Sequence, residues 1–132
     1  MTRQDAGAGL ISTAAGVVVF LMFVLFAVQL LFGLYASSTV TAVANDAATR
    51  AAAADSPSLP VIEADARANL GRIGDDARFT WTSDDENGDG HDDTVVLTVV
   101  VEPPRFVPSS LAPGGFGEVR RTVRVRIEER QP

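Results

Sequence analysis

The residues of this chain that are best suited to chemistry are the clustered oxygen donors of SDDENGDGHDD, residues 83–93. The pattern D-x-N-x-D-G begins there at Asp85 and ends at Gly90. Alternate oxygen donors converge on a calcium ion when a glycine permits the sharp turn between them. The spacing therefore predicts a calcium loop, and its candidate ligands are Asp85, Asn87, Asp89 and Asp93.

The same segment is also typical of an acidic hairpin loop that holds no ion. An EF-hand carries a bidentate glutamate at the twelfth loop position, which is Val96 here, and no helices are predicted on either side. Asn87-Gly88 and Asp89-Gly90 are dipeptides that favour tight hairpin turns. An EF-hand is therefore excluded, whereas a weak calcium loop and a solvated turn both stay open.

Catalytic machinery is not indicated by the sequence. The single histidine, His91, lies in the acidic loop, and no serine has a nucleophile motif around it. The chain contains no cysteine, which excludes disulfides, a thiol nucleophile and a Cys-ligated zinc site. The acidic residues form no second cluster that would supply a paired general acid and base. We therefore predict that the protein is not an enzyme and that it has no cofactor other than the calcium considered above.

A charge-free apolar run from Leu10 to Ala36 dominates the N-terminal part of the chain. About 20 apolar residues in a helix span the hydrocarbon layer of a bilayer, so this run of about 27 residues is long enough to cross it. A secretory signal has a shorter apolar region behind a clearly basic segment, whereas only Arg3, offset by Asp5, precedes this run. The sequence predicts a short leader at 1–9 and a transmembrane helix at 10–36.

The orientation of this helix follows from the charges beside it. Arg3 and the α-amine give a small positive bias to the N-terminal side, and the remainder of the chain is acidic. We therefore expect a single-pass protein of the cell membrane, with a cytoplasmic N-terminus and an extracytoplasmic C-terminal domain.

Three positions within the apolar run are candidates for contacts with another helix. Ser12 and Gly16 form a small-xxx-small pair, which lets a second helix approach closely. Gln29 is a lone amide among apolar residues and is able to form a hydrogen bond between helices. The predicted helix-helix contacts are Ser12, Gly16 and Gln29.

The alanine-rich segment 37–54 contains no glycine or proline, so the transmembrane helix is predicted to continue through it. Pro57 removes a backbone donor and ends the helix together with Asp55 and Ser56. Such a continuation needs a partner for its alanine face. That partner is either the chain's own distal domain or neighbouring copies.

Residues 55–132 are predicted to form one small extracytoplasmic domain. Apolar residues recur at helical spacing from Leu59 to Ile73, and Gly74 supplies a stop. Strands are predicted at Arg78–Thr82, Thr94–Glu102 and Val119–Glu128, with a Pro/Gly-rich loop over residues 105–117. In the last strand Arg121 shares the half-buried face with Val119, Val123, Val125 and Ile127.

These elements define an α+β fold. A long N-terminal transmembrane helix continues into a pilin-like stalk, and one further helix covers a three-stranded antiparallel sheet. Lysine is absent, and the net charge of −6 equals the six acids of the loop, so nucleic acid is not an expected partner. Those six acids are Asp84, Asp85, Glu86, Asp89, Asp92 and Asp93.

The order of these elements resembles the TadE-like proteins of tight-adherence (Tad/Flp) pilus systems, particularly the actinobacterial type. The resemblance is carried by DAGAGLISTAAGVVVFLMFVLFAVQLLFGLYASSTVTAVANDAATRAAA, residues 5–53, and extends to the distal domain by element order. It implies a membrane-anchored, pilin-like minor component or assembly factor of a Tad-type pilus or secretion system. The implied partners are the membrane and other small single-span pilin-like proteins or pilus assembly components.

The leader departs from the prepilin pattern. A prepilin of this class carries a glycine before the cleavage point and a glutamate five residues beyond it. Ser12 occupies that position after Gly7, and Ala14 occupies it after Gly9. Cleavage of the leader therefore stays open. A second class of function stays open as well, namely a calcium-binding surface adhesin or binding module on a single-span anchor.

Overall fold

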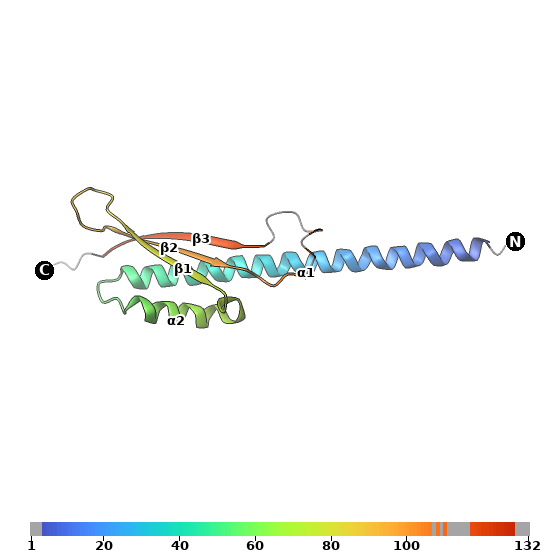
Figure 1. The fold of residues 1–132 in the computed structure, drawn as a ribbon, viewed down its shortest axis with the longest axis horizontal. Coiled ribbons are helices and arrows are strands. Elements are labelled where there is room, and N and C mark those ends of the chain that lie inside the picture. The colour runs from blue at the N-terminus through green and yellow to red at the C-terminus, as the bar shows by residue number, and fades with distance from the viewer. Residues whose placement is uncertain (1–3, 107, 109, 111–116, 129–132) are drawn as a thin grey trace.

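The computed structural model describes residues 4–106, 108, 110 and 117–128. One long helix, α1 (Gln4–Ala52), runs the length of the molecule. Its C-terminal half lies against a shorter helix, α2 (Leu59–Leu70), and a three-stranded sheet, while its N-terminal half extends away from both (Figure 1). The fold is α+β, as the sequence predicted. We call the side towards the N-terminus of α1 proximal and the opposite side distal.

Helix α1 is continuous over 49 residues, so the apolar run and the alanine-rich segment form one element. It ends at Ala52, slightly before the predicted end at Ala54. A turn follows in which the Ser56 N–H donates to the Ala53 carbonyl at 3.1 Å. The Ala52 carbonyl accepts the Glu128 N–H at 3.0 Å, which satisfies one of the acceptors that a helix end leaves unpaired.

Helix α2 begins after Ser58 with Pro60 in its first turn, where a missing N–H costs nothing. It ends at Leu70 because Gly71 adopts a φ of +61°, and the Gly71 N–H donates to the Ala68 carbonyl. A 3₁₀ turn, η1 (Gly71–Gly74), follows. The predicted helical segment from Leu59 to the stop at Gly74 is therefore present, as α2 followed by the 3₁₀ turn, and the left-handed backbone at Gly71 marks the change between the two.

The sheet contains β1 (Arg78–Asp84), β2 (Thr94–Val101) and β3 (Val119–Arg126) in the order β1-β2-β3, with both pairings antiparallel. Strand β1 continues past the predicted Thr82, and β2 ends just before Pro103 and Pro104. The register places Leu97 opposite both Trp81 and Val123. The inner face of the sheet covers both helices.

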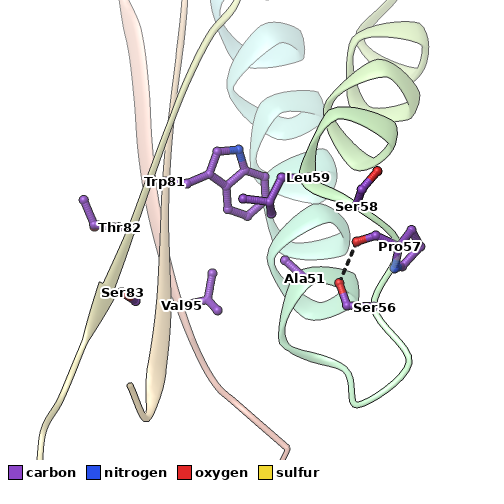
Figure 2. Close-up of a pocket in the computed structure, with 9 residues that line it drawn as sticks. All are labelled: Ala51, Ser56, Pro57, Ser58, Leu59, Trp81, Thr82, Ser83 and Val95. Atoms are coloured by element: carbon purple, nitrogen blue, oxygen red, sulfur yellow. Dashed lines mark hydrogen bonds between the residues drawn. The ribbon is translucent and has the colours of Figure 1, made fainter. Parts of the chain in front are cut away.

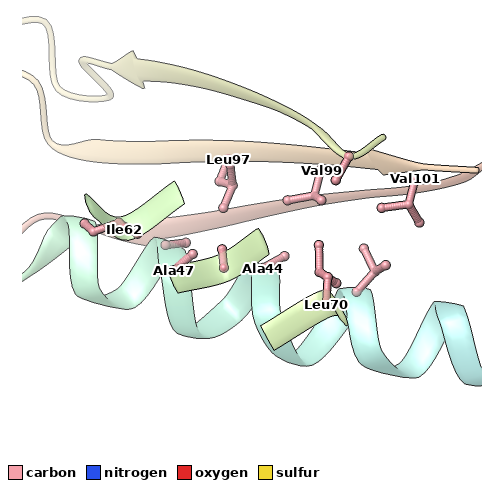
Figure 3. Close-up of a cluster of buried hydrophobic side chains, with 11 residues drawn as sticks. Ala44, Ala47, Ile62, Leu70, Leu97, Val99 and Val101 are labelled. Atoms are coloured by element: carbon pink, nitrogen blue, oxygen red, sulfur yellow. The ribbon is translucent and has the colours of Figure 1, made fainter. Parts of the chain in front are cut away.

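The hydrophobic core lies between this inner face, the C-terminal half of α1 and α2 (Figure 3). The C-terminal half of α1 contributes mainly alanines, whose small side chains let α2 and the sheet approach the helix backbone closely. Phe79 and Trp81 are partly buried and pack against the core. The core is formed by Val40, Ala44, Ala47, Ala48, Ile62, Ala66, Leu70, Ala77, Leu97, Val99 and Val101.

The alanine face of α1 is therefore covered by the chain's own domain. The sequence left two possible partners for the helical continuation at residues 37–54, the chain's own domain and neighbouring copies. The structure shows the first of these contacts. The two halves of α1 have opposite environments, because the distal half lies under the domain and the proximal half is uncovered.

Candidate functional site

The proximal half of α1 presents exposed apolar side chains on all sides. The exposed residues include the consecutive Leu21, Met22 and Phe23, which point in directions about 100° apart around the helix axis. A water-soluble helix normally buries an apolar stripe and exposes a polar face, and this segment does neither. Within the described part of the chain, α1 is the one helix that is long and apolar enough to cross a membrane.

Ser12 and Gly16, two of the predicted helix-contact residues, lie on this uncovered segment and are exposed. A Cβ atom added at Gly16 would meet no atom within 4 Å. The helix surface at these positions is therefore accessible to a second helix. Contact there stays a prediction.

Gln29, the third predicted contact residue, has a different environment. Its side chain is only 4% exposed. Its Oε1 accepts the Phe106 N–H at 2.8 Å, and its Nε2 makes a longer contact of 3.5 Å with the Pro104 carbonyl. The Phe106 ring lies 5.1 Å from that of Phe32, measured between centroids. Gln29 thus binds the segment that follows β2, while a contact of Gln29 with another helix stays a prediction.

Sequence reasoning did not identify this partner of Gln29. Residues 103–106 show no hydrophobic periodicity and are separated from Gln29 by most of the domain. The one sequence feature that pointed to a partner was the amide of Gln29 itself, because a buried polar group in an apolar helix requires a hydrogen-bond partner.

A pocket of about 630 Å³ lies beside this contact, at the proximal end of the domain. Aromatic and apolar side chains form its helix side, and charged groups stand at its rim. Its lining residues are Phe32, Tyr35, Ala36, Leu70, Gly71, Arg72, Ile73, Asp76, Glu102, Pro103, Pro104 and Phe106.

A second pocket, of about 480 Å³, lies between the end of α1, the turn into α2 and the sheet (Figure 2). Its polar groups are hydroxyls, backbone and the Trp81 indole N–H, and none of the described residues that line it has a titratable side chain. The Trp81 indole forms one wall. The lining residues are Ala51, Ser56, Pro57, Ser58, Leu59, Trp81, Thr82, Ser83 and Val95.

The predicted calcium ligands lie in the loop between β1 and β2, at the distal end of the molecule. The two carboxylate oxygens of Asp85 accept the N–H groups of Gly88 and Gly90 at 2.7 and 2.8 Å. Gly88 and Gly90 have φ values of +75° and +88°, which favour glycine. The N–H of Gly90 is the largest influence that lowers the pKa of Asp85.

Asn87 and Asp89 are engaged in the same way. The Asn87 Oδ1 accepts the Asp89 N–H at 2.9 Å, and the Asp89 Oδ1 accepts the His91 N–H at 2.9 Å. These side chains therefore fold the loop through their own backbone. Among the described residues, no three acidic or histidine side chains are arranged to hold a metal ion. Calcium binding at Asp85, Asn87, Asp89 and Asp93 stays a prediction.

The arginines of β3 divide between the two faces of the sheet. Arg121 points to α1, where its guanidinium donates from Nε to the Thr41 Oγ1 at 3.1 Å and from Nη2 to the Ser37 Oγ. On the outer face Arg124 lies 3.7 Å from the Asp84 carboxylate, and Arg120 lies 3.2 Å from that of Glu118. The predicted inward position of Arg121 is confirmed by its contacts with α1.

Comparison of the chain with models of known families, with curated proteins and with solved structures returned no match. The architecture itself is pilin-like. A long apolar N-terminal helix precedes a short helix and a three-stranded antiparallel sheet that lie on its C-terminal half. The accessible apolar half of α1 is the candidate functional site.

Proposed function

We propose that the protein is a membrane-anchored, pilin-like minor component or assembly factor of a Tad-type pilus or secretion system. The proximal half of α1 spans the cell membrane, with its N-terminus in the cytoplasm and the domain outside. Its partners are other small single-span pilin-like proteins or pilus assembly components. The role is structural.

One observation carries this proposal, namely the contrast between the two halves of α1. Its distal half is covered by the domain through buried alanines, whereas its proximal half has no protein cover over the apolar side chains from Leu10 to Phe26. Exposing so large an apolar surface to water is unfavourable by about 25 cal/mol per Å². A bilayer or the helices of partner proteins remove that cost.

The assignment to the Tad system rests on the resemblance of residues 5–53 to TadE-like proteins, and the pilin-like order of the elements supports it. We propose neither an enzymatic activity nor a nucleic-acid partner.

Photo-crosslinking in native membranes tests the proposal. A photoreactive residue at Gly16 should crosslink to other small single-span proteins, because this position is open on all sides. The matched control is a photoreactive residue at Ala42, which is exposed on the domain-covered half of α1. Deletion of the gene should in addition abolish Tad-type pili or secretion.

A packing variant sharpens this test. Gly16→Leu should weaken co-purification with these partners, whereas Val19→Leu, which enlarges an already bulky exposed position, should leave it unchanged. Crosslinks to lipid alone, together with unchanged pili in the deletion strain, would contradict the proposal.

A further inference from the structure

We propose that the hydrocarbon layer ends at Gln29 and that the surface formed by Leu31, Leu34, Tyr35 and Phe106, here called the collar, lies in the lipid headgroup layer. The domain then rests directly on a phospholipid bilayer. This inference rests on the proposed function in one respect, that α1 spans the membrane.

The first argument concerns the backbone beside Gln29. Residues 103–106 are neither helix nor strand, and the Phe106 N–H bonds to the Gln29 side chain at 2.8 Å. Non-helical backbone with free polar groups is not tolerated where it faces hydrocarbon. The exposed charges of Glu102 and Arg105 lie in or next to the same segment and are equally excluded from the bilayer interior. The hydrocarbon must therefore end on the proximal side of Gln29.

The second argument concerns length. From Leu10 to Val28 the helix has about 19 residues and rises roughly 28 Å, which matches the hydrocarbon thickness of about 30 Å. The span of 10–36 predicted from the sequence would rise roughly 40 Å and exceed that thickness. The contact between Gln29 and Phe106 brings the domain to the level of Gln29. The residues in excess of the hydrocarbon thickness are therefore those from 29 to 36.

The third argument concerns the collar itself. Leu31, Leu34 and Tyr35 are 65%, 67% and 65% exposed, and Phe106 is 44% exposed. Along the helix axis the Tyr35 backbone stands roughly 9 Å beyond Gln29, just past a headgroup layer about 5 to 8 Å thick, and because helical side chains tilt towards the N-terminus its ring points back into that layer. Tyrosine is enriched in this layer because its ring has an apolar body and a polar tip. The collar is continuous with the membrane span, so the same bilayer covers both.

Tryptophan fluorescence tests the contact between the collar and the bilayer. Trp81 is the single tryptophan, so a Trp81→Phe, Phe106→Trp double variant reports from position 106 alone. In vesicles of phosphatidylcholine and phosphatidylglycerol, we expect the indole at position 106 to lose more than half of its emission to lipids brominated near the headgroup. A Trp81→Phe, Thr80→Trp variant, with its indole on the outer face of β1, is the control and should be insensitive to these lipids.

Cysteine labelling tests the boundary without altering Phe106. The chain has no cysteine, so each introduced thiol is the single target of a membrane-impermeant maleimide. Relative to labelling in detergent, we expect Leu25→Cys to stay unmodified, Ser38→Cys to label readily, and Leu34→Cys to label at a lower rate. All three side chains are exposed, so these replacements leave the core intact.

Three results would overturn the inference. The first is Leu34→Cys protected as fully as Leu25→Cys, which would extend the span through residue 34. The second is strong quenching of the indole at position 106 by aqueous acrylamide with no effect of brominated lipid. The third is an indole shielded from both quenchers in a manner that depends on the protein-to-lipid ratio, which would mean that a second copy covers the collar. If the chain does not float with the vesicles at all, α1 is not an anchor and the proposed function fails as well.

Discussion

Trp81 of β1 donates its indole N–H to the Glu63 carboxylate of α2 at 2.7 Å. Close to it, the Arg67 guanidinium of α2 stands 5.0 Å from the centre of the Phe79 ring. Strand β1 lies at an edge of the sheet and pairs with β2 alone. These two side-chain contacts therefore fix β1 to the helix beneath it, in addition to the ladder with β2.

Replacement of Glu63 tests the first of these contacts. Glu63→Ala should lower the free energy of unfolding by about 1 kcal/mol, because the Trp81 N–H loses its acceptor. Glu63→Gln keeps an oxygen at the same place and should restore most of that loss. Urea unfolding in detergent micelles, followed by the emission of Trp81, measures both variants. Equal destabilisation by Ala and Gln would show that the hydrogen bond is unimportant.

The alanine face of α1 predicts strong sensitivity to size. Ala44 is fully buried against α2 and the sheet, so Ala44→Leu should destabilise the domain by about 1 to 3 kcal/mol or prevent close packing of the helices. Ala42→Leu is the matched control, since Ala42 lies two residues away on the exposed side of the same helix and should change stability by less than about 0.5 kcal/mol. The same urea titration compares them, and similar losses for both variants would contradict the packing described here.

Arg121 and Arg120 are neighbours on β3 that face opposite sides of the sheet. Arg121→Leu should cost about 1 kcal/mol, because the hydroxyls of Ser37 and Thr41 lose a charged donor at a partly exposed site. Arg120→Leu should have little effect, since its ion pair with Glu118 is solvated. Thermal unfolding of the two variants in micelles distinguishes the two faces. A larger loss of stability for Arg120→Leu than for Arg121→Leu would contradict the placement of Arg121 on the inner face of the sheet.

The distal loop should respond to acid. Hydrogen bonds to the ionised Asp85, with the largest effect from the Gly90 N–H, lower its pKa in the folded state below the ordinary value of 3.8. A lowered pKa means that these bonds stabilise the loop fully at pH values above the unfolded pKa. That stabilisation is lost as the pH falls through the lower, folded-state pKa.

Amide exchange and chemical shifts of Gly88 and Gly90 report this transition between about pH 6 and about pH 2. Asp85→Asn retains a side-chain acceptor without a charge, so its loop should lose the pH dependence. Asp92→Asn, in the same loop, should keep it. An unchanged transition in Asp85→Asn would assign the titration to another group.

Much of the domain was predictable because its signals are local. The alternation from Val119 to Ile127 placed Arg121 on the inner face, where it contacts α1. Pro103 and Pro104 marked the end of the central strand, since proline is unable to continue a central ladder. The absence of glycine and proline between residues 37 and 54 predicted a continuous helix through that segment, and the structure has one as far as Ala52.

Other features depend on contacts that no local pattern encodes. The sequence pointed to Gly74 as the helix stop, whereas the change from α-helix to 3₁₀ turn at Gly71 depends on a left-handed backbone conformation that the spacing of apolar residues does not reveal. The partner of Gln29 comes from a segment without periodicity, so the length of the apolar run alone placed the end of the span at Ala36. In the acidic loop the sequence left a calcium loop and a solvated turn open, and the structure adds which side-chain oxygens bind which backbone N–H groups of the turn.

The Glu128 N–H donates to the Ala52 carbonyl, and β3 packs on α1. These contacts bear on the order in which the protein is synthesised and folds. The strand that covers the long helix is translated after it, so in the membrane-spanning role that we propose the helix enters the bilayer while its alanine face still has no cover. Contacts of such large sequence separation also form slowly. In that role, membrane insertion and domain folding are expected to be separate steps, and between them the alanine face is open to a chaperone or an assembly partner.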